Sequence, residues 1–295
     1  MEILGDIIAR LPRRLIDAAS NAQWRNPLFK RAFDTVADRF KNRDGIIRRG
    51  AGRGLKFNPG RSDGGYLLGT TEPGVQMALQ LLLRPGMSFY DLGANVGFHS
   101  MIAARLIGPS QGDVVSFEPV EENARQLRHN IELNGFRRVT VRQEALSDIE
   151  EEEGRFLISD EPTFGMLAST GKEPTRCVGS IMVKVRRLDD VVARHALRPP
   201  DVVKVDVEGA EVDVLRGGRE VLRGFRPVLL MELHGTNHDI AELLGAADYT
   251  IAVLGSSATV RESPWDAYIV AVPAEKKEQS NGLLDQLRQP EFKHR

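Results

Sequence analysis

Cysteine is nearly absent from this 295-residue sequence, which contains one, Cys177. A disulfide within the chain is therefore excluded, and scarce cysteine suits a reducing compartment such as the cytoplasm. Long apolar runs are also missing, since no stretch approaches the roughly 20 apolar residues that cross a bilayer. Glu2 and Asp6 interrupt the first residues, so no secretory signal is predicted. We expect a soluble, cytoplasmic protein.

An excess of charge of one sign is absent as well, because 40 Lys and Arg residues face 41 Asp and Glu residues. Aromatic residues make up 6% of the chain. Without a strongly basic surface or an aromatic-rich basic groove, we expect no nucleic-acid partner. Apolar residues, at 41%, suffice for a sizeable core and are too few for a polytopic membrane protein.

Positive charge is concentrated near the N-terminus, where residues 1–61 contain 14 Lys and Arg against 6 Asp and Glu. Apolar residues at helical spacing predict helices over 3–16 and 27–40, and short strands are expected within 43–65. We interpret residues 1–70 as a helical and short-strand extension. Its charge indicates a solvated helical surface or, as the alternative, a peripheral contact with an anionic surface such as lipid headgroups.

From Met87 onward, short apolar strands alternate with helices, after a first helix at 72–83. Such alternation is typical of a doubly wound, mainly parallel α/β sheet. We therefore expect one α/β domain over residues 71–273. Its strands are predicted at 88–92, 114–117, 139–142, 202–207, 228–232, 249–254 and 267–272, and its later helices at 97–106, 121–134, 210–222 and 238–245.

An insertion at 148–200 interrupts this alternation between the third and fourth parallel strands. Extra strands are predicted within it at 155–158 and 181–187. A long excursion from a compact sheet is often a lid or a binding loop. The C-terminal tail, 274–295, is mostly polar, and we expect a surface helix or disorder there.

A glycine-containing turn, Asp-Leu-Gly-Ala-Asn-Val-Gly, runs from Asp91 to Gly97 between the first strand and its helix. Glycine lets the backbone approach a ligand closely, and the helix N-terminus offers free N–H groups. A dinucleotide site would carry G-x-G-x-x-G, which is missing here. An acid at position 91 suits the ammonium of a methionine moiety, directly or through water, better than a pyrophosphate. We assign Asp91, Gly93, Asn95 and Gly97 to such a cofactor site.

A second acid, Glu118, ends the strand Val114–Phe117 that follows in the chain. An acid at this position can accept both hydroxyl groups of a ribose. Alone, it would more often be a helix cap or a surface charge. Combined with the glycine turn, it predicts a site for an adenosyl cofactor.

Three acids cluster in the segment Val203 to Glu211. Asp206 and Glu208 are two residues apart, which would place both on one face of a strand, and Glu211 starts the next helix. Open α/β sheets bind ligands at this edge. Helix capping explains one of the acids but not all three.

These motifs together resemble the FkbM-type methyltransferase family. The resemblance rests on DLGANVGFHS, VVSFEPVEENARQLRHNIELNG, VRQEALSD, DVVKVDVEGAEVDVLRGG and PVLLMELHG, in this order over about residues 66–235. It implies a seven-stranded, Rossmann-like class I methyltransferase fold. It also implies methyl transfer from S-adenosylmethionine, usually to a hydroxyl oxygen of a small molecule, sugar or lipid.

The resemblance also extends the expected cofactor site. Family members carry a Glu ahead of the first motif, which makes Glu72 a candidate contact. The end of the third strand meets the adenine in class I enzymes, so Glu144 or the backbone of Ala145 is expected there.

A hydroxyl acceptor loses a proton when it is methylated, and the candidate bases are Asp206, Glu208 and His234. Clustered acids raise one another's pKa, which favours a useful base. For His234, a structural role is the alternative. We expect catalysis without a metal, and a divalent cation held by Asp206 and Glu208 is the alternative.

Two other enzyme classes stay open, a nucleic-acid methyltransferase, because of the basic N-terminal part, and a nicotinamide-dependent oxidoreductase on a related sheet. A scaffold that binds the cofactor without transfer is a third, non-enzymatic reading. The sequence specifies neither the acceptor nor an oligomeric state.

Overall fold

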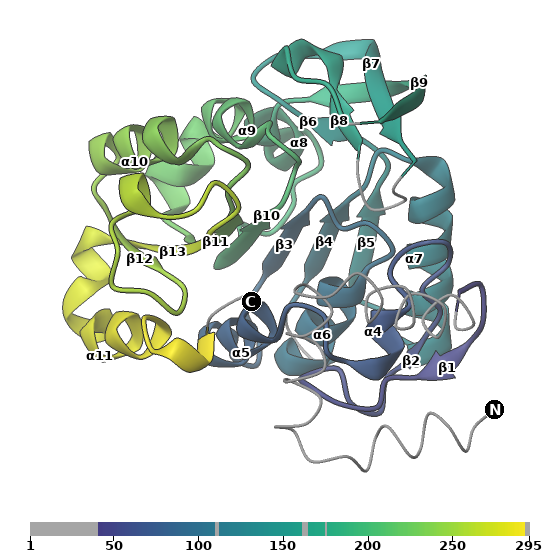
Figure 1. The fold of residues 1–295 in the computed structure, drawn as a ribbon, viewed down its shortest axis with the longest axis horizontal. Helices are drawn as coiled ribbons and strands as arrows, with labels where there is room; N and C mark the ends of the chain where they lie inside the picture. The colour runs from purple at the N-terminus through teal and green to yellow at the C-terminus, as the bar shows by residue number, and fades with distance from the viewer. Residues whose placement is uncertain (1–40, 110–111, 161–164, 175, 293–295) are drawn as a thin grey trace.

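The computed structural model describes residues 41–109, 112–160, 165–174 and 176–292 (Figure 1). The helices expected at 3–16 and 27–40 lie outside this part of the chain. Short strands were expected within 43–65, and two are present, β1 (Gly45–Ile46) and β2 (Lys56–Phe57). They pair antiparallel. Within the described residues, no helix is long and apolar enough to cross a membrane.

A seven-stranded sheet forms the centre of the molecule, in the order β12-β13-β11-β10-β3-β4-β5. Its strands pair in parallel from β11 to β5, and β13 is antiparallel to both of its neighbours. The doubly wound, mainly parallel α/β sheet expected from the sequence is thus confirmed. The bounds are β3 Phe89–Leu92, β4 Val114–Phe117, β5 Val139–Arg142, β10 Val202–Val205, β11 Val228–Glu232, β12 Tyr249–Val253 and β13 Tyr268–Pro273.

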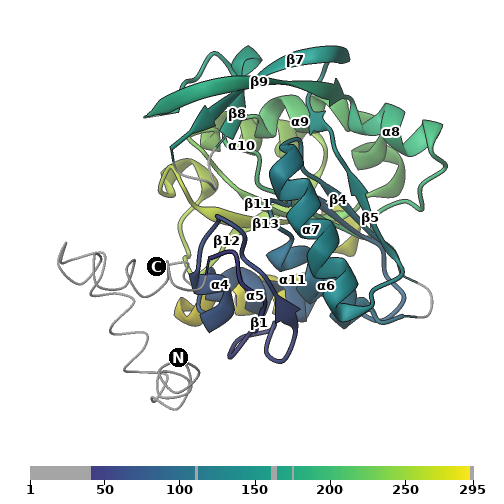
Figure 2. The same ribbon diagram turned by 90° about the vertical axis from the view of Figure 1, so that its right-hand side faces the viewer.

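Helices cover both faces of this sheet (Figures 1 and 2). One apolar core packs α5, α6 and α11 against one face, and a second packs α8, α9 and α10 against the other. Both cores need strands that are apolar on each side, which explains their near-continuous Val, Ile and Leu content. The bounds are α4 Gly65–Leu68, α5 Pro73–Leu82, α6 Phe98–Ile107, α7 Glu121–Asn134, α8 Leu188–Arg194, α9 Glu211–Gly217, α10 Asn237–Ala246 and α11 Lys277–Leu287.

The insertion forms a second, four-stranded sheet in the order β6-β9-β7-β8. Figure 2 shows it as a layer above the main sheet, next to α9 and α10. The two strands predicted here exist but are longer than expected, because they pair with each other over most of their length. The bounds are β6 Ala145–Leu146, β7 Glu151–Ser159, β8 Gly165–Leu167 and β9 Cys177–Arg186.

The C-terminal segment forms a helix, one of the two expectations for it, but packs more deeply than a polar surface helix would. Helix α11 is present, but Leu284 and Leu287 are buried in the core, and so is Phe292 in the turn that follows. Short single turns complete the described chain: η1 Ala168–Thr170, η2 Val221–Phe225 (a π-helical turn), η3 Val260–Glu262, η4 Ala274–Lys276 and η5 Pro290–Phe292.

Candidate functional site

A cavity of about 780 Å³ lies at the carboxyl ends of the central parallel strands, between the main sheet and the insertion. This is where open α/β sheets bind their ligands. Nine of the eleven site residues predicted from the sequence line it, and Asp91 and Gly97 do not. The nine are Glu72, Gly93, Asn95, Glu118, Glu144, Ala145, Asp206, Glu208 and His234.

The glycine turn after β3 needs glycine for two different reasons. Gly93 has φ +82°, and a Cβ there would lie 1.7 Å from the carbonyl oxygen of Asp206. Gly97 has φ +87°, and a Cβ there would lie 2.2 Å from the side chain of Leu127. Any side chain would therefore push the turn away from the loop that follows β10 at position 93, and push α6 away from α7 at position 97. Gly97 contributes to the site by packing, not by lining the cavity.

Glu118 follows β4 and is fixed by the backbone. Its carboxylate is 5% exposed and accepts hydrogen bonds of 2.9 Å from the N–H groups of Asn95 and Val120. Asn123 donates a longer one of 3.3 Å, which a ligand hydroxyl can replace. Burial raises the pKa of Glu118 to about 7 in spite of these bonds. A buried acceptor held in this way at the cavity wall fits a ribose, whose hydroxyl groups are donors.

The predicted adenine contacts lie farther along the wall. Glu144 accepts hydrogen bonds of 3.1 and 3.0 Å from Arg142, and Arg142 also contacts His195 at 2.7 Å. Because the Glu144 carboxylate is already paired, an adenine bound through it would compete with Arg142. Ala145 is buried at the start of β6 and needs no such exchange. Its contact with the adenine stays a prediction.

Asp91 lies behind the cavity wall. It is 1% exposed, and its Oδ2 accepts a hydrogen bond of 2.6 Å from Ser100. Its Oδ1 lies 3.9 Å from Nζ of Lys204 and accepts no hydrogen bond from any residue that the structure describes. A direct contact with a ligand ammonium is therefore not what this geometry shows, and a contact through water stays a prediction.

Lys204 is the main site residue that the sequence reasoning missed. It points from the middle of β10 into the cavity wall, is 1% exposed, and pairs with Asp206 at 2.8 Å. Burial lowers the pKa of its ammonium, but the charges of Asp206 and Asp91 outweigh burial and raise it. A signal did exist, because a lysine within the apolar run Val-Val-Lys-Val must be paired if the strand is buried.

The expectation that Asp206 and Glu208 share one face of a strand is wrong. Strand β10 ends at Val205, and both acids lie in the loop after it, where Glu208 has φ +50° and Gly209 has φ +95°. Both acids still line the cavity, because this loop, with its left-handed residues Glu208 and Gly209, follows the end of β10. Oε2 of Glu208 is buried and lies 3.2 Å from Nε2 of His234.

His234 is held by Glu211, which starts α9 and is fully buried. Oε1 of Glu211 lies 2.8 Å from Nδ1 of His234, and its Oε2 accepts a hydrogen bond of 2.9 Å from Thr236. Burial lowers the pKa of His234, but the bond to Glu211 and the charge of Glu208 outweigh it and raise this pKa to about 10. The imidazole is therefore a cation at neutral pH.

Glu232 and Tyr268, from β11 and β13, complete the polar cluster, and neither was assigned from the sequence. The hydroxyl of Tyr268 donates a hydrogen bond to Glu232, and burial raises the pKa of Glu232 to about 9. Ligand atoms of Asp206, Glu232 and His234 lie within 4.8 Å of one another. A divalent cation would find its ligands in this group, a different set from the pair Asp206 and Glu208.

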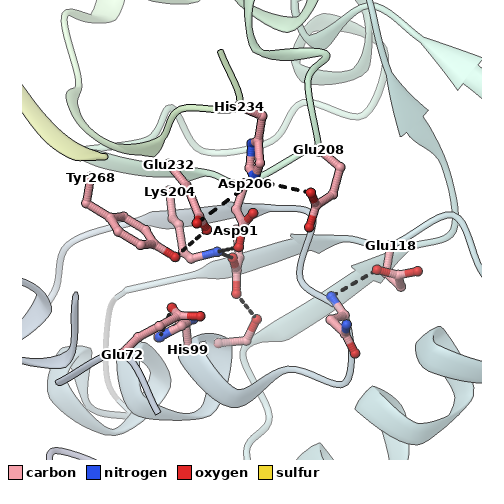
Figure 3. A network of polar contacts seen from close by, with 12 residues as sticks. Glu72, Asp91, His99, Glu118, Lys204, Asp206, Glu208, Glu232, His234 and Tyr268 are labelled. Atoms are coloured by element: carbon pink, nitrogen blue, oxygen red, sulfur yellow. Dashed lines mark hydrogen bonds and ion pairs between the residues drawn. The ribbon is translucent and has the colours of Figure 1, made fainter. Parts of the chain in front are cut away.

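Figure 3 shows the arrangement of these side chains. Glu118 lies at one end of the group, whereas His234, Glu232 and Tyr268 gather around Lys204 and Asp206, and Glu208 lies between His234 and Glu118. Glu72, with φ +47° at the start of α5, approaches the cluster from below, and its Oε2 lies 3.3 Å from Nε2 of His99. Burial raises the pKa of Glu72 to about 7.

Comparison with known proteins places this site in a family. The model of the methyltransferase FkbM domain matches residues 91–255. The chain is 28% identical to the hexuronic acid methyltransferase AglP of Haloferax volcanii over 59% of its own length and 69% of that protein. It is 30% identical to the 2-O-methyltransferase NoeI of Sinorhizobium fredii, over 49% of its length and 62% of NoeI.

Among solved structures, a methyltransferase FkbM from Methylobacillus flagellatus is 20% identical, with a TM-score of 0.44. The match covers 64% of this chain and 45% of that one. The family domain matches more than half of the sequence and contains the glycine turn, Glu118 and the cluster around Asp206. The chain belongs to the FkbM family of S-adenosylmethionine-dependent methyltransferases.

Proposed function

We propose that this enzyme methylates a hydroxyl oxygen of a carbohydrate or of a related small molecule. The observation that carries the proposal is the polar cluster of Asp206, Glu208, Glu232 and His234 across the cavity from Glu118. One side of the cavity fits the cofactor, and the other can take a proton from an acceptor. The names of two relatives, a hexuronic acid methyltransferase and a 2-O-methyltransferase, support an oxygen acceptor.

S-adenosylmethionine supplies an electrophilic methyl group when it is bound, with a thioether as the leaving group. The residues of this chain fit the cofactor, because the cavity wall offers the buried acceptor of Glu118 and a tight turn in which Gly93 packs directly against the backbone of Asp206. Transfer forms an O–C bond and breaks an S–C bond, and the hydroxyl proton passes to a base. The protein therefore mainly orients the two reactants, excludes water and accepts that proton.

Glu208 is the base that the geometry favours among the three candidates. Asp206 pairs with Lys204, whose charge, with that of His234, overcomes the effect of burial and lowers the pKa of this carboxyl. His234 holds a proton at neutral pH and cannot accept another. Glu208 lines the cavity with a buried Oε2, and burial raises its pKa to about 8, close to the working pH that suits a general base.

His234 and Asp206 then act as positioning groups for Glu208. His234 lies 3.2 Å from Glu208 and is itself oriented by Glu211. We expect His234→Ala and Asp206→Asn each to lower kcat and to leave the cofactor Kd nearly unchanged. If both variants turned over at the rate of the parent enzyme, the catalytic role of this cluster would be refuted.

The test of the proposed function is transfer of isotopically labelled methyl from S-adenosylmethionine to mono- and oligosaccharides by the full chain. Mass spectrometry should find products heavier by one CH₂ unit, with the methyl on oxygen. If the label were transferred to RNA under the same conditions, the enzyme would be a nucleic-acid methyltransferase. If the methyl were found on nitrogen alone, the acceptor atom would be nitrogen and not oxygen. Equilibrium dialysis against S-adenosylmethionine and NAD distinguishes the enzyme from a nicotinamide-dependent oxidoreductase.

A further inference from the structure

Trp265 has an exposed side chain on a backbone that hydrogen bonds fix in position. It lies in the loop before β13 and is 60% exposed, so much of its indole surface is accessible to a ligand in the cavity that it lines. The loop is fixed, since the N–H of Gly235 donates to the carbonyl of Trp265 at 2.8 Å. The amide of Asn237 also donates to the carbonyl groups of Ser263 and Pro264.

The position of Trp265 places it beside the reacting groups. Its ring centroid lies 6.3 Å from that of His234, and both side chains line the same cavity as Glu208. Val178 of β9, 63% exposed, lines this cavity from the insertion. A sugar ring whose apolar C–H face lies on the indole would therefore have its hydroxyl groups in the part of the cavity that holds His234 and its partner Glu208.

The charge of the cavity wall restricts what such a ring can carry. Ten acidic side chains line the cavity, whereas Arg61 and Lys204 are the only lysine or arginine among the described residues that do. Lys204 is already paired with Asp206, and Arg61 is 68% exposed with Glu122 at 3.9 Å. The third cation of the wall, His234, is held between Glu208 and Glu211. Even without the four acids whose pKa burial raises (Glu72, Glu118, Glu208 and Glu232), six acidic side chains of the wall remain against these three cations. A carboxylate on the acceptor would therefore meet an excess of like charge, because the cations that line the described wall already face acids.

We propose that Trp265 is the stacking platform for the acceptor, and that the acidic wall selects a sugar ring that is neutral or carries an amine over one that carries a carboxylate. This inference rests on the proposed function and narrows it. It also predicts an acceptor different from that of the relative named for hexuronic acid, whose acceptor carries a carboxylate.

The experiment uses the fluorescence of Trp265 itself. The sequence contains two tryptophans, so Trp24→Phe leaves Trp265 as the only one. The full-length variant, with S-adenosylhomocysteine present, is titrated with three methyl glycosides that share one pyranose ring. They carry outside the ring a hydroxyl group (glucoside), an ammonium (aminodeoxyglucoside) or a carboxylate (glucuronoside).

We expect the glucoside and the aminodeoxyglucoside to change the tryptophan emission. At low salt the Kd of the glucuronoside should be at least about tenfold higher than that of the glucoside, and this difference in Kd should decrease as salt is added. In otherwise native protein, Trp265→Ala should raise the acceptor KM about tenfold, while Phe225→Ala, at an exposed aromatic outside the cavity, should not.

Two results would overturn the inference. One is an emission that none of the three glycosides changes, and the other is a glucuronoside that binds as tightly as the glucoside. Failure of the proposed function has a separate signature. If the sugars bind Trp265 and labelled methyl never reaches them, the subsite stands and the assigned reaction does not.

Discussion

Replacing Lys204 with Met tests the charge balance at the centre of the site. The two side chains are similar in length, so the change removes the charge and keeps most of the volume. The ammonium is 1% exposed, 2.8 Å from Asp206 and 3.9 Å from Asp91. Without it, two carboxylates remain in a buried position with no cation between them.

Removing one partner of a buried ion pair costs about 3–5 kcal/mol. A domain of this size is stable by roughly 5–15 kcal/mol, so Lys204→Met should remove a large part of the free energy of unfolding. At about 2–4 °C per kcal/mol, the expected fall in Tm is roughly 6–20 °C.

The loss should depend on pH. The pKa of Asp206 is lowered in the folded state, so its contribution is complete above its unfolded pKa and disappears as the pH falls through the folded one. In the variant, Asp206 and Asp91 lack the Lys204 ammonium, and acid protonates them, which removes the cost of burying two unpaired charges. We therefore expect a larger difference in Tm between parent and variant at pH 8 than at pH 5.

Thermal unfolding followed by circular dichroism measures this difference, with Lys184→Met as the matched control. Lys184 is exposed on β9, and its replacement should change stability by no more than about 0.5 kcal/mol. A Tm for Lys204→Met within the range of the control, or a loss equal at both pH values, would refute the charge balance inferred here.

The remaining predictions concern the cofactor, the base and a metal. Glu118→Gln should weaken S-adenosylmethionine binding about tenfold or more in calorimetry, because the amide donates where the ribose needs an acceptor; an unchanged Kd would remove Glu118 from the site. In the parent enzyme kcat should rise with pH and level off above about 8, as Glu208 loses its proton. Glu208→Gln should lower kcat by about 10²–10⁴ and abolish this rise, with the cofactor Kd unchanged; a retained rise would assign it to another group. Exhaustive chelation should leave turnover intact, and a loss restored by Mg²⁺ would instead place a cation among Asp206, Glu232 and His234.

The sheet was predictable because each of its strands carries its own signal. The strands that are buried on both faces are mostly apolar, and the turns between them contain glycine or proline. The insertion was less predictable, since β7 and β9 are exposed along much of their length and owe their extent to pairing with each other. The packing of the C-terminal segment was missed because Leu283, Leu284 and Leu287 are the only apolar residues of a short stretch within an otherwise polar tail.

The residues expected to bind the cofactor could be picked out for the same reason, as they lie at strand ends in local motifs, and most of them line the cavity. The acceptor side depends on which strands become neighbours. Lys204 meets Asp91 only because β10 lies beside β3, and Tyr268 meets Glu232 only because β13 lies beside β11. Neither adjacency is encoded in a local pattern of residues.

The antiparallel strand β13 sets the order in which a growing chain can complete the enzyme. Strand β12 pairs with β13 alone, and β13 also covers the edge of β11. Until residues 268–273 leave the ribosome, β11 has a bare edge, β12 has no partner, and such edges invite aggregation. Residues 268–273 also bring the hydroxyl of Tyr268 to Glu232, so a chain interrupted before Tyr268 would keep the sequence motifs of a methyltransferase with an exposed sheet edge and without this hydrogen bond.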